Sequence, residues 1–250
     1  MNRKQLAIFS IMLVVYALCV FLTYAFFIDQ LTAMAKIPMP KMEVSNAVLG
    51  LANAGIVLVA YGSLGLLGYW FARKLTLPGI FSADGNWRRW FLTPLWIGLA
   101  CGVFVVIGDL LFAPVNGIGR FPHPRFPVSI LASLSAGIGE EILFRGFVFG
   151  LWGLLLNWLF KRFDGRRAAL WIANIIAALA FGAGHLGTVL VLTGAATLSE
   201  LSPVLLAEVF ILNGAIGLLA GQRYMKDGLL AASGVHFWSD VVFHVVWGFF

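Results

Sequence analysis

Charged residues are scarce in this chain. Only 11% of its 250 residues are Asp, Glu, Lys or Arg, whereas a soluble domain carries roughly 25%. Together with 61% hydrophobic residues, this scarcity excludes a disordered chain and a soluble nucleic-acid-binding protein. The formal net charge of +6 therefore has a cause other than nucleic acid. A mean hydropathy of +0.94 indicates a protein embedded in a lipid bilayer.

Cysteine is scarce as well. The chain has only Cys19 and Cys101, and both lie inside apolar runs. Two isolated cysteines exclude a disulfide scaffold and a zinc knuckle, and they give no sign of an oxidising compartment or a thiol nucleophile. We expect both to fill space in the core.

Long apolar runs, by contrast, are abundant. A helix of about 20 residues crosses roughly 30 Å of hydrocarbon, and runs of about this length occur at 5–28, 47–72, 91–113, 128–160, 168–188, 203–222 and 229–249. The 22 Phe, 9 Trp and 28 Gly suit helices packed in a bilayer. The sequence predicts an all-α, polytopic membrane helix bundle with about seven to eight transmembrane helices.

One run is too long for a single crossing. As a straight helix, residues 128–160 would extend roughly 50 Å. We therefore expect this helix to break or to emerge from the membrane, near Gly146 or Gly150.

Lys and Arg are distributed unevenly between the runs. On one side of the predicted bundle lie Arg3, Lys4, Arg73, Lys74, Arg88, Arg89, Lys161, Arg162, Arg166, Arg167, Arg223 and Lys226. On the other side lie only Lys36, Lys41, Arg120 and Arg125. Because loops rich in Lys and Arg stay in the cytoplasm, the amino terminus is predicted to be cytoplasmic. This asymmetry also explains the positive net charge.

Some ionisable residues lie in the apolar runs, where each costs about 2.5 to 3.5 kcal/mol to insert. Asp109 and Glu208 fall within about one turn of a predicted outer end, where a carboxylate reaches water, and we expect them to be structural or interfacial. Glu140, Glu141 and Arg145 lie deeper. Glu141 and Arg145 are four residues apart in the favourable acid-first order and are predicted to pair.

Glu140 is predicted to lie on a different face of the helix from Arg145. It is five residues from Arg145, about 140° around the helix, and is left without that partner. An unpaired carboxylate inside the membrane suits a general base or acid. A purely structural ion-pair cluster that holds helices together is the alternative interpretation.

Histidines on two further runs extend this polar set. His185 ends the fifth run after Phe181, with Gly182 and Gly184 between them allowing close approach of a helix or a substrate. His236 and Asp240 are four residues apart on the last run and share a face. His244 follows on that face, where a structural role is favoured, and His123 is expected to be solvated in a loop.

Three sequence patterns resemble the signature of the CPBP family of intramembrane proteases, also called the CAAX protease and bacteriocin-processing, or Abi, family. Glu-Glu-x-x-x-Arg occurs as Glu140, Glu141 and Arg145, Phe-x-x-x-His as Phe181 and His185, and His-x-x-x-Asn/Asp as His236 and Asp240. The approach to the third pattern also looks like the family, with Phe210, Gly217, Gly221, Tyr224, Gly228 and residues 229–232. Asp240 stands where the members that process prenylated proteins have Asn.

The resemblance implies an intramembrane endopeptidase that acts on a membrane-associated or prenylated protein or peptide. Residues 1–127 are then N-terminal transmembrane helices and residues 128–250 the catalytic core, within one integrated membrane domain. Rival protease motifs are missing from the sequence: it has no His-Glu-x-x-His and no Gly-x-Ser-x-Gly. The expected surroundings are the plasma membrane and a peptide or membrane-protein substrate, with no nucleic acid.

The spacing and the resemblance together give a mechanism. Glu140, assisted by His185, takes a proton from a water that attacks a peptide carbonyl, and His236 with Asp240 stabilises the oxyanion. Glu141, Arg145 and Phe181 support this site. The rival chemistry binds a divalent metal such as zinc through Glu140, His185, His236 and Asp240. Metal-free catalysis without a cofactor is favoured, because no single helix offers two closely spaced His ligands.

Two matters stay open. From the predicted inner ends, His185 and His236 lie at depths of roughly 25 and 10 Å. Either these ends are wrong by several residues or 186–202 form a re-entrant hairpin, and in both cases we expect a hydrated cavity in the bundle. A non-catalytic membrane scaffold or chaperone and a proton-coupled transporter remain alternatives to a protease.

Overall fold

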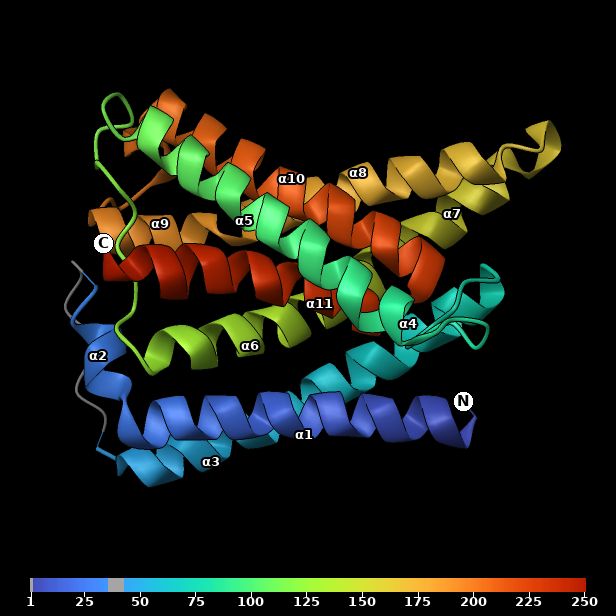
Figure 1. The fold of residues 1–250 in the computed structure, drawn as a ribbon, viewed down its shortest axis with the longest axis horizontal. Helices are drawn as coiled ribbons and strands as arrows, with labels where there is room; N and C mark the ends of the chain where they lie inside the picture. Colours follow the sequence, from blue (N-terminus) through green and yellow to red (C-terminus); the bar gives the residue numbers. More distant parts are fainter. Residues whose placement is uncertain (1, 36–42) are drawn as a thin grey trace.

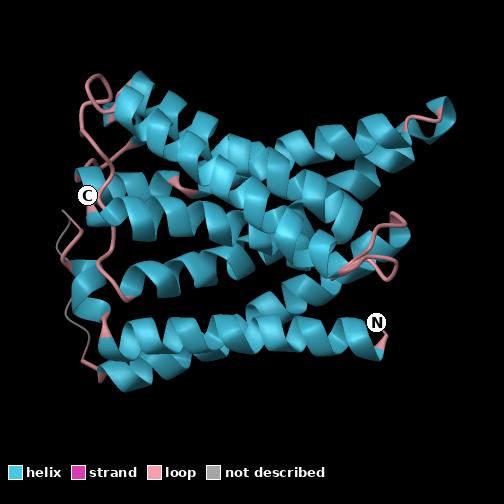
Figure 2. Ribbon diagram, in the orientation of Figure 1, coloured by secondary structure: helices cyan, strands magenta, loops and turns pink. Residues whose placement is uncertain are grey.

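The computed structural model describes residues 2–35 and 43–250, so Lys36 and Lys41 of the charge pattern lie outside the described residues. Within those two ranges, every regular element is a helix and none is a strand (Figure 2). The α-helices are α1 (Arg3–Phe26), α2 (Ile28–Thr32), α3 (Asn46–Ile56), α4 (Gly62–Lys74), α5 (Thr93–Phe112), α6 (Val128–Glu141), α7 (Gly150–Phe160), α8 (Arg166–Gly184), α9 (Leu186–Thr193), α10 (Pro203–Asp227) and α11 (Leu229–Asp240).

Among the described residues, seven helical stretches are long and apolar enough to cross a bilayer. They are Arg3–Phe26, Asn46–Lys74, Arg88–Phe112, Val128–Phe163, Arg166–Thr193, Pro203–Asp227 and Leu229–Phe249. The predicted polytopic helix bundle is confirmed. The largest errors in the predicted ends are at the fifth and sixth stretches, which continue five residues further, to Thr193 and Asp227.

The stretches run side by side, and the two chain ends lie at opposite ends of the bundle (Figure 1). Helices α1 and α3 pack together along one edge, and α5 and α10 lie along the other. Between them, α11 packs against α5, α6 and α10, while α8 packs against α7 and α10. Helices α6 and α11 therefore lie between the two edges, and α8 packs on α10 and on the π-helical turns that continue α6.

A break in the long fourth stretch had been expected near Gly146 or Gly150, but the helix is continuous there. It continues through wider π-helical turns over Ile142–Phe149, and a Cβ at Gly68 of α4 would lie 2.7 Å from the backbone of Gly146. The glycines let the two helices touch instead of ending one of them. The excess length emerges as the α7–α8 hairpin, which projects beyond the other helices (Figure 1).

This projection resolves the difference in predicted depth between His185 and His236. Helix α8 begins at Arg166 in the projecting hairpin, beyond the starts of the other helices. The distance of His185 from the start of α8 therefore overstates its depth in the bundle. After His185, α9 continues the same stretch toward the end of the bundle where the C-terminus lies (Figure 1). The two inner ends were predicted to within two residues, at Arg166 and Leu229, so the mismatch came from the projection of α8. Residues 186–202 do not turn back as a re-entrant hairpin.

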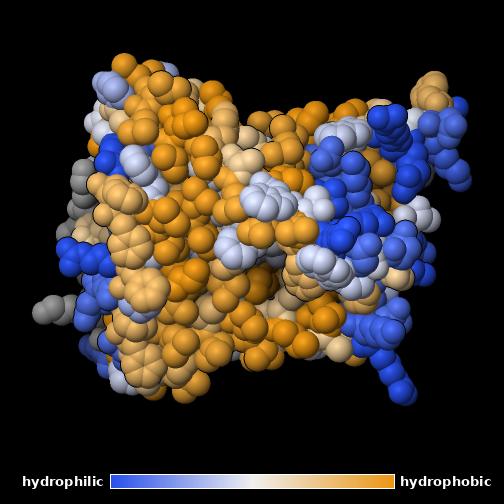
Figure 3. Space-filling model, viewed as in Figure 1, coloured by the Kyte–Doolittle hydropathy of each residue, from blue (hydrophilic) through white to orange (hydrophobic). Residues whose placement is uncertain are grey.

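The surface has a broad hydrophobic band and one strongly hydrophilic end (Figure 3). We call this hydrophilic end, which holds the N-terminus and the α7–α8 hairpin, the basic end, because the exposed Arg3, Lys4, Lys161, Arg162 and Arg167 lie there. The opposite end, which we call the outer end, holds α2, the 113–127 loop and the C-terminus. The sequence asymmetry of Lys and Arg thus corresponds to two physical ends.

Toward the basic end, the bundle is closed by a packed hydrophobic cluster. Phe149 and Tyr224 stack edge to face at a centroid distance of 5.4 Å and are almost fully buried with Leu75 and Ile80. Gly228, with φ +95°, joins α10 to α11, and a Cβ there would lie 2.7 Å from the carbonyl oxygen of Ile80. Only glycine suits this turn, which holds the 75–81 segment over the start of α11.

Candidate active site

Side chains of the three sequence patterns meet inside the bundle. Nε2 of His185 lies 3.9 Å from Oε2 of Glu140, and Nε2 of His236 lies 4.0 Å from the same oxygen. Asp240 approaches the same His236 nitrogen, with its Oδ2 at 3.6 Å. Glu140 and His185 are about one-third exposed, at 35% and 32% of their side chains. The His236 side chain is buried, at 2%.

Behind His236 lies a fully buried ion pair. Nη1 of Arg145 is 3.0 Å from Oε1 of Glu141, as the four-residue spacing predicted, and neither side chain is exposed. Nδ1 of His236 donates to that same Glu141 oxygen at 2.9 Å. The sequence had paired His236 with Asp240, because the two share a helix face. In the structure Glu141 accepts the hydrogen bond of His236, because α6 and α11 pack closely enough to join residues far apart in sequence.

The Phe181 ring lies at the centre of these groups. Its centroid is 4.8 Å from that of His185 and 5.1 Å from that of His236, both edge to face. The Arg145 guanidinium carbon lies 4.7 Å from the centroid of the same ring, within cation–π range. Nδ1 of His185 also donates to the Phe181 carbonyl at 2.9 Å. Phe181 therefore contacts one residue of each pattern and fixes both imidazole rings.

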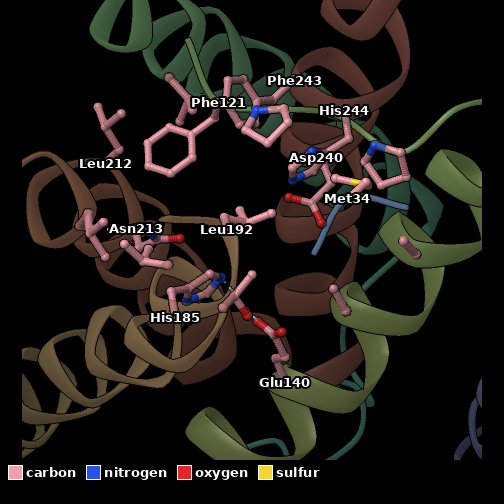
Figure 4. A pocket seen from close by; sticks show the side chains of 18 of the residues that line it. Met34, Phe121, Glu140, His185, Leu192, Leu212, Asn213, Asp240, Phe243 and His244 are labelled. Carbon is pink, nitrogen blue, oxygen red and sulfur yellow. Dashed lines mark hydrogen bonds and ion pairs between the residues drawn. The ribbon is translucent and has the colours of Figure 1, made fainter. Parts of the chain in front are cut away.

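A cavity of about 400 Å³ opens in front of Glu140 and His185. Its wall is formed by α5, α6, α9, α10 and α11, together with residues just after α2 and the 113–127 loop. Apolar side chains such as Met34, Phe121, Leu192 and Leu212 line most of it (Figure 4). Glu140 and His185 lie close together on facing helices at one side, and His244 lies at another (Figure 4). The predicted polar site inside the bundle thus adjoins a cavity large enough for several side chains.

Comparison with known proteins supports the same region. The family model described as Type II CAAX prenyl endopeptidase Rce1-like matches residues 122–242, which include all three patterns. Over these residues, just under half of the chain, the sequence is similar to the CAAX protease family. No curated protein and no solved structure matches the chain. The match supports an intramembrane endopeptidase of the CAAX kind, and the apolar helical stretches support an integral membrane protein.

The zinc alternative receives no support from the arrangement of the family residues. In the part of the chain that the structure describes, no group of three or more His, Cys, Asp or Glu is placed to hold a metal ion. Each Nδ1 donates to a protein oxygen, as the second nitrogen of a metal-bound imidazole also does, and the two free Nε2 atoms lie 3.9 and 4.0 Å from Oε2 of Glu140. The metal alternative is therefore left to the chelator test, and no step below is routed through a metal.

The predicted places of Asp109 and Glu208 near span ends had suggested that both carboxylates reach water, but they do not. Both are fully buried. Oδ1 of Asp109 accepts the backbone N–H of Phe121 at 2.9 Å, and Oε2 of Glu208 accepts Nδ2 of Asn116 at 2.7 Å. These two carboxylates hold the 113–127 loop against α5 and α10. The loop covers them, which is why their positions near the span ends misled the prediction.

His123 is not solvated either. Its Nδ1 lies 3.2 Å from Nδ1 of His244, and its ring packs edge to face on Phe243 at 4.7 Å. Burial lowers the pKa of His123, an effect that Asp109 opposes and Arg120 reinforces. The pair connects the loop to the last stretch, so His244 has a loop contact as well as a place in the cavity wall.

Sequence reasoning missed several cavity residues. Asn213 lies on the same side of the cavity as His185 (Figure 4), with its Nδ2 bonded to the Val209 carbonyl at 2.8 Å. An amide in an apolar run was a usable signal, because an amide too is costly in lipid. The contributions of Met34 and Phe121 had no signal, because apolar residues in a wall resemble apolar residues anywhere.

Proposed function

We propose that this protein is an intramembrane endopeptidase that activates water with Glu140 and His185 and works without a metal. The observation that carries the proposal is the placement of an unpaired, one-third-exposed carboxylate at the side of a cavity, with two imidazole Nε2 atoms facing it at 3.9 and 4.0 Å. Those distances are too long for direct hydrogen bonds. They suit a water molecule held between the groups.

The His185 tautomer favours this role. Because the Phe181 carbonyl can only accept, Nδ1 of His185 carries the ring proton and the neutral ring offers a lone pair at Nε2. A water between Glu140 and His185 donates its two protons to Oε2 and Nε2. Its own lone pair then faces the cavity, where a peptide carbonyl would lie. As the oxygen attacks, Glu140 takes the proton, and it later passes this proton to the leaving amine.

His236 and Asp240 are the proposed oxyanion site. Nδ1 of His236 stays bonded to Glu141, which fixes the ring plane. When the ring is doubly protonated, Nε2 donates to the negative oxygen that forms during attack. Such a preoriented donor typically contributes about 3 to 4 kcal/mol. Asp240, 3.6 Å from Nε2, balances the charge of the ring.

The proposed substrate is a peptide segment of a membrane-associated protein. The cavity wall is mostly apolar, which suits an extended peptide with hydrophobic side chains. We further infer residence in the plasma membrane with a cytoplasmic amino terminus, from the basic end of the bundle. No nucleic acid is needed to explain the charge.

The test compares newly formed protein termini in membranes from cells that carry different variants. Glu140→Gln keeps the shape of the side chain but cannot accept the proton, so we expect termini made by the wild type to fall by at least about 10²-fold. Glu200→Gln makes the same chemical change on an exposed loop and should leave cleavage intact. If Glu140→Gln accumulates to the normal level and produces the same termini as the wild type, the proposal is wrong.

A further inference from the structure

The cavity lies toward one end of the bundle only. Its wall includes residues just after α2, Phe121 and Pro122 of the 113–127 loop, Leu192 of α9 and His244 near the C-terminus. All of these belong to the outer end (Figure 1). Pro122 and Thr188 are exposed, so the cavity reaches the surface at the loop and beside α9.

Toward the basic end, the described residues around α11 form a packed core. Between His236 and the basic end, α11 packs in a cluster with Leu75, Ile80, Phe149 and Tyr224, each at most 2% exposed. Backbone N–H groups at the start of α11 bond to the 79–80 segment at 2.9 Å, which closes the cluster from the basic end. A peptide entering from that end would have to displace this packed core.

The basic end also carries most of the Lys and Arg of the chain. In the described part of the outer end, Arg120 and Arg125 are the basic residues, and Arg120 is stacked on the Trp247 ring at 4.1 Å. The basic end is therefore the cytoplasmic one. The cavity then opens on the extracytoplasmic side.

We infer that the candidate active site takes its substrate from the extracytoplasmic side, as an apolar peptide segment of an exported or membrane-spanning protein. A prenylated C-terminus in the cytoplasm would face the closed end. That a substrate enters the cavity rests on the proposed function. The direction of access rests only on the cavity, the packed core and the charges.

Single-cysteine variants and a membrane-impermeant maleimide test the direction. The native Cys19 and Cys101 are 5% and 3% exposed, so the unmodified chain should stay unlabelled and serve as the blank. Ala196→Cys at the outer end and Ala83→Cys at the basic end are matched exposed alanines. Ala136→Cys lies in the cavity wall, one helical turn from Glu140.

We expect Ala196→Cys and Ala136→Cys to be labelled in intact cells, and Ala83→Cys only after permeabilisation. If Ala83→Cys is labelled in intact cells, or if Ala136→Cys is not, the inference is overturned. The labelling needs no cleavage, so it succeeds or fails independently of the Glu140→Gln comparison.

Discussion

Two adjacent glutamates have different surroundings in this protein. Glu141 is fully buried, ion-paired with Arg145 and hydrogen-bonded to His236, while Glu140 faces the cavity without a hydrogen-bond partner for its Oε2. The spacing of Glu141 and Arg145 predicted the ion pair. It did not predict the bond to His236, because that contact depends on how α6 and α11 pack. Helical geometry can be predicted from sequence, whereas contacts between distant helices cannot.

The buried ion pair leads to a stability prediction. Arg145→Leu removes the cation and leaves Glu141 charged and buried, which typically costs about 3 to 5 kcal/mol. We expect the free energy of unfolding, measured in detergent by chemical denaturation, to fall by about that amount.

The double variant Glu141→Leu with Arg145→Leu provides the control. It leaves no uncompensated charge, so it should be more stable than Arg145→Leu alone. It should still lack cleavage, since His236 has lost the oxygen that holds its Nδ1. If the single variant matches the wild type in stability, the ion pair is not the structural support that we describe.

At the scale of elements, the 113–127 loop is fixed by groups that the sequence placed elsewhere. Asp109 and Glu208 were expected to reach water and His244 to have a structural role on its own helix, and all three contact the loop. The sequence correctly predicted the apolar stretches that surround the loop. It could not predict how the loop folds back over their ends, because such contacts follow no period.

The loop should loosen in acid. Burial lowers the pKa of His123 below its ordinary value of 6.5, so the closed loop binds fewer protons than an open one. The closed state is therefore fully stable above about pH 6.5 and loses stability as the pH falls below that value. We expect tryptic cleavage after the exposed Arg120 and Arg125 to accelerate on acidification, relative to His123→Gln at the same pH. Equal acceleration in the variant would contradict the role of His123.

At the scale of the whole molecule, the bundle is closed at its basic end and open to a cavity at the other. The long Val128–Phe163 helix and the projecting α7–α8 hairpin allow His185 and His236 to meet at one depth. Span lengths counted from sequence gave a mismatch, because the count assumed that every helix begins at the membrane surface. Motif spacing identified the residues that gather, and the tertiary packing determined which of them touch.

Cleavage by purified, metal-stripped protein tests the central claim most directly. A peptide that contains a terminus found in the cellular comparison is incubated with wild type and with Glu140→Gln, both in the presence of a chelator. The account predicts that the wild type keeps cleaving and that Glu140→Gln is slower by about 10²-fold or more. Loss of wild-type cleavage that zinc restores, or equal cleavage by Glu140→Gln, would contradict it.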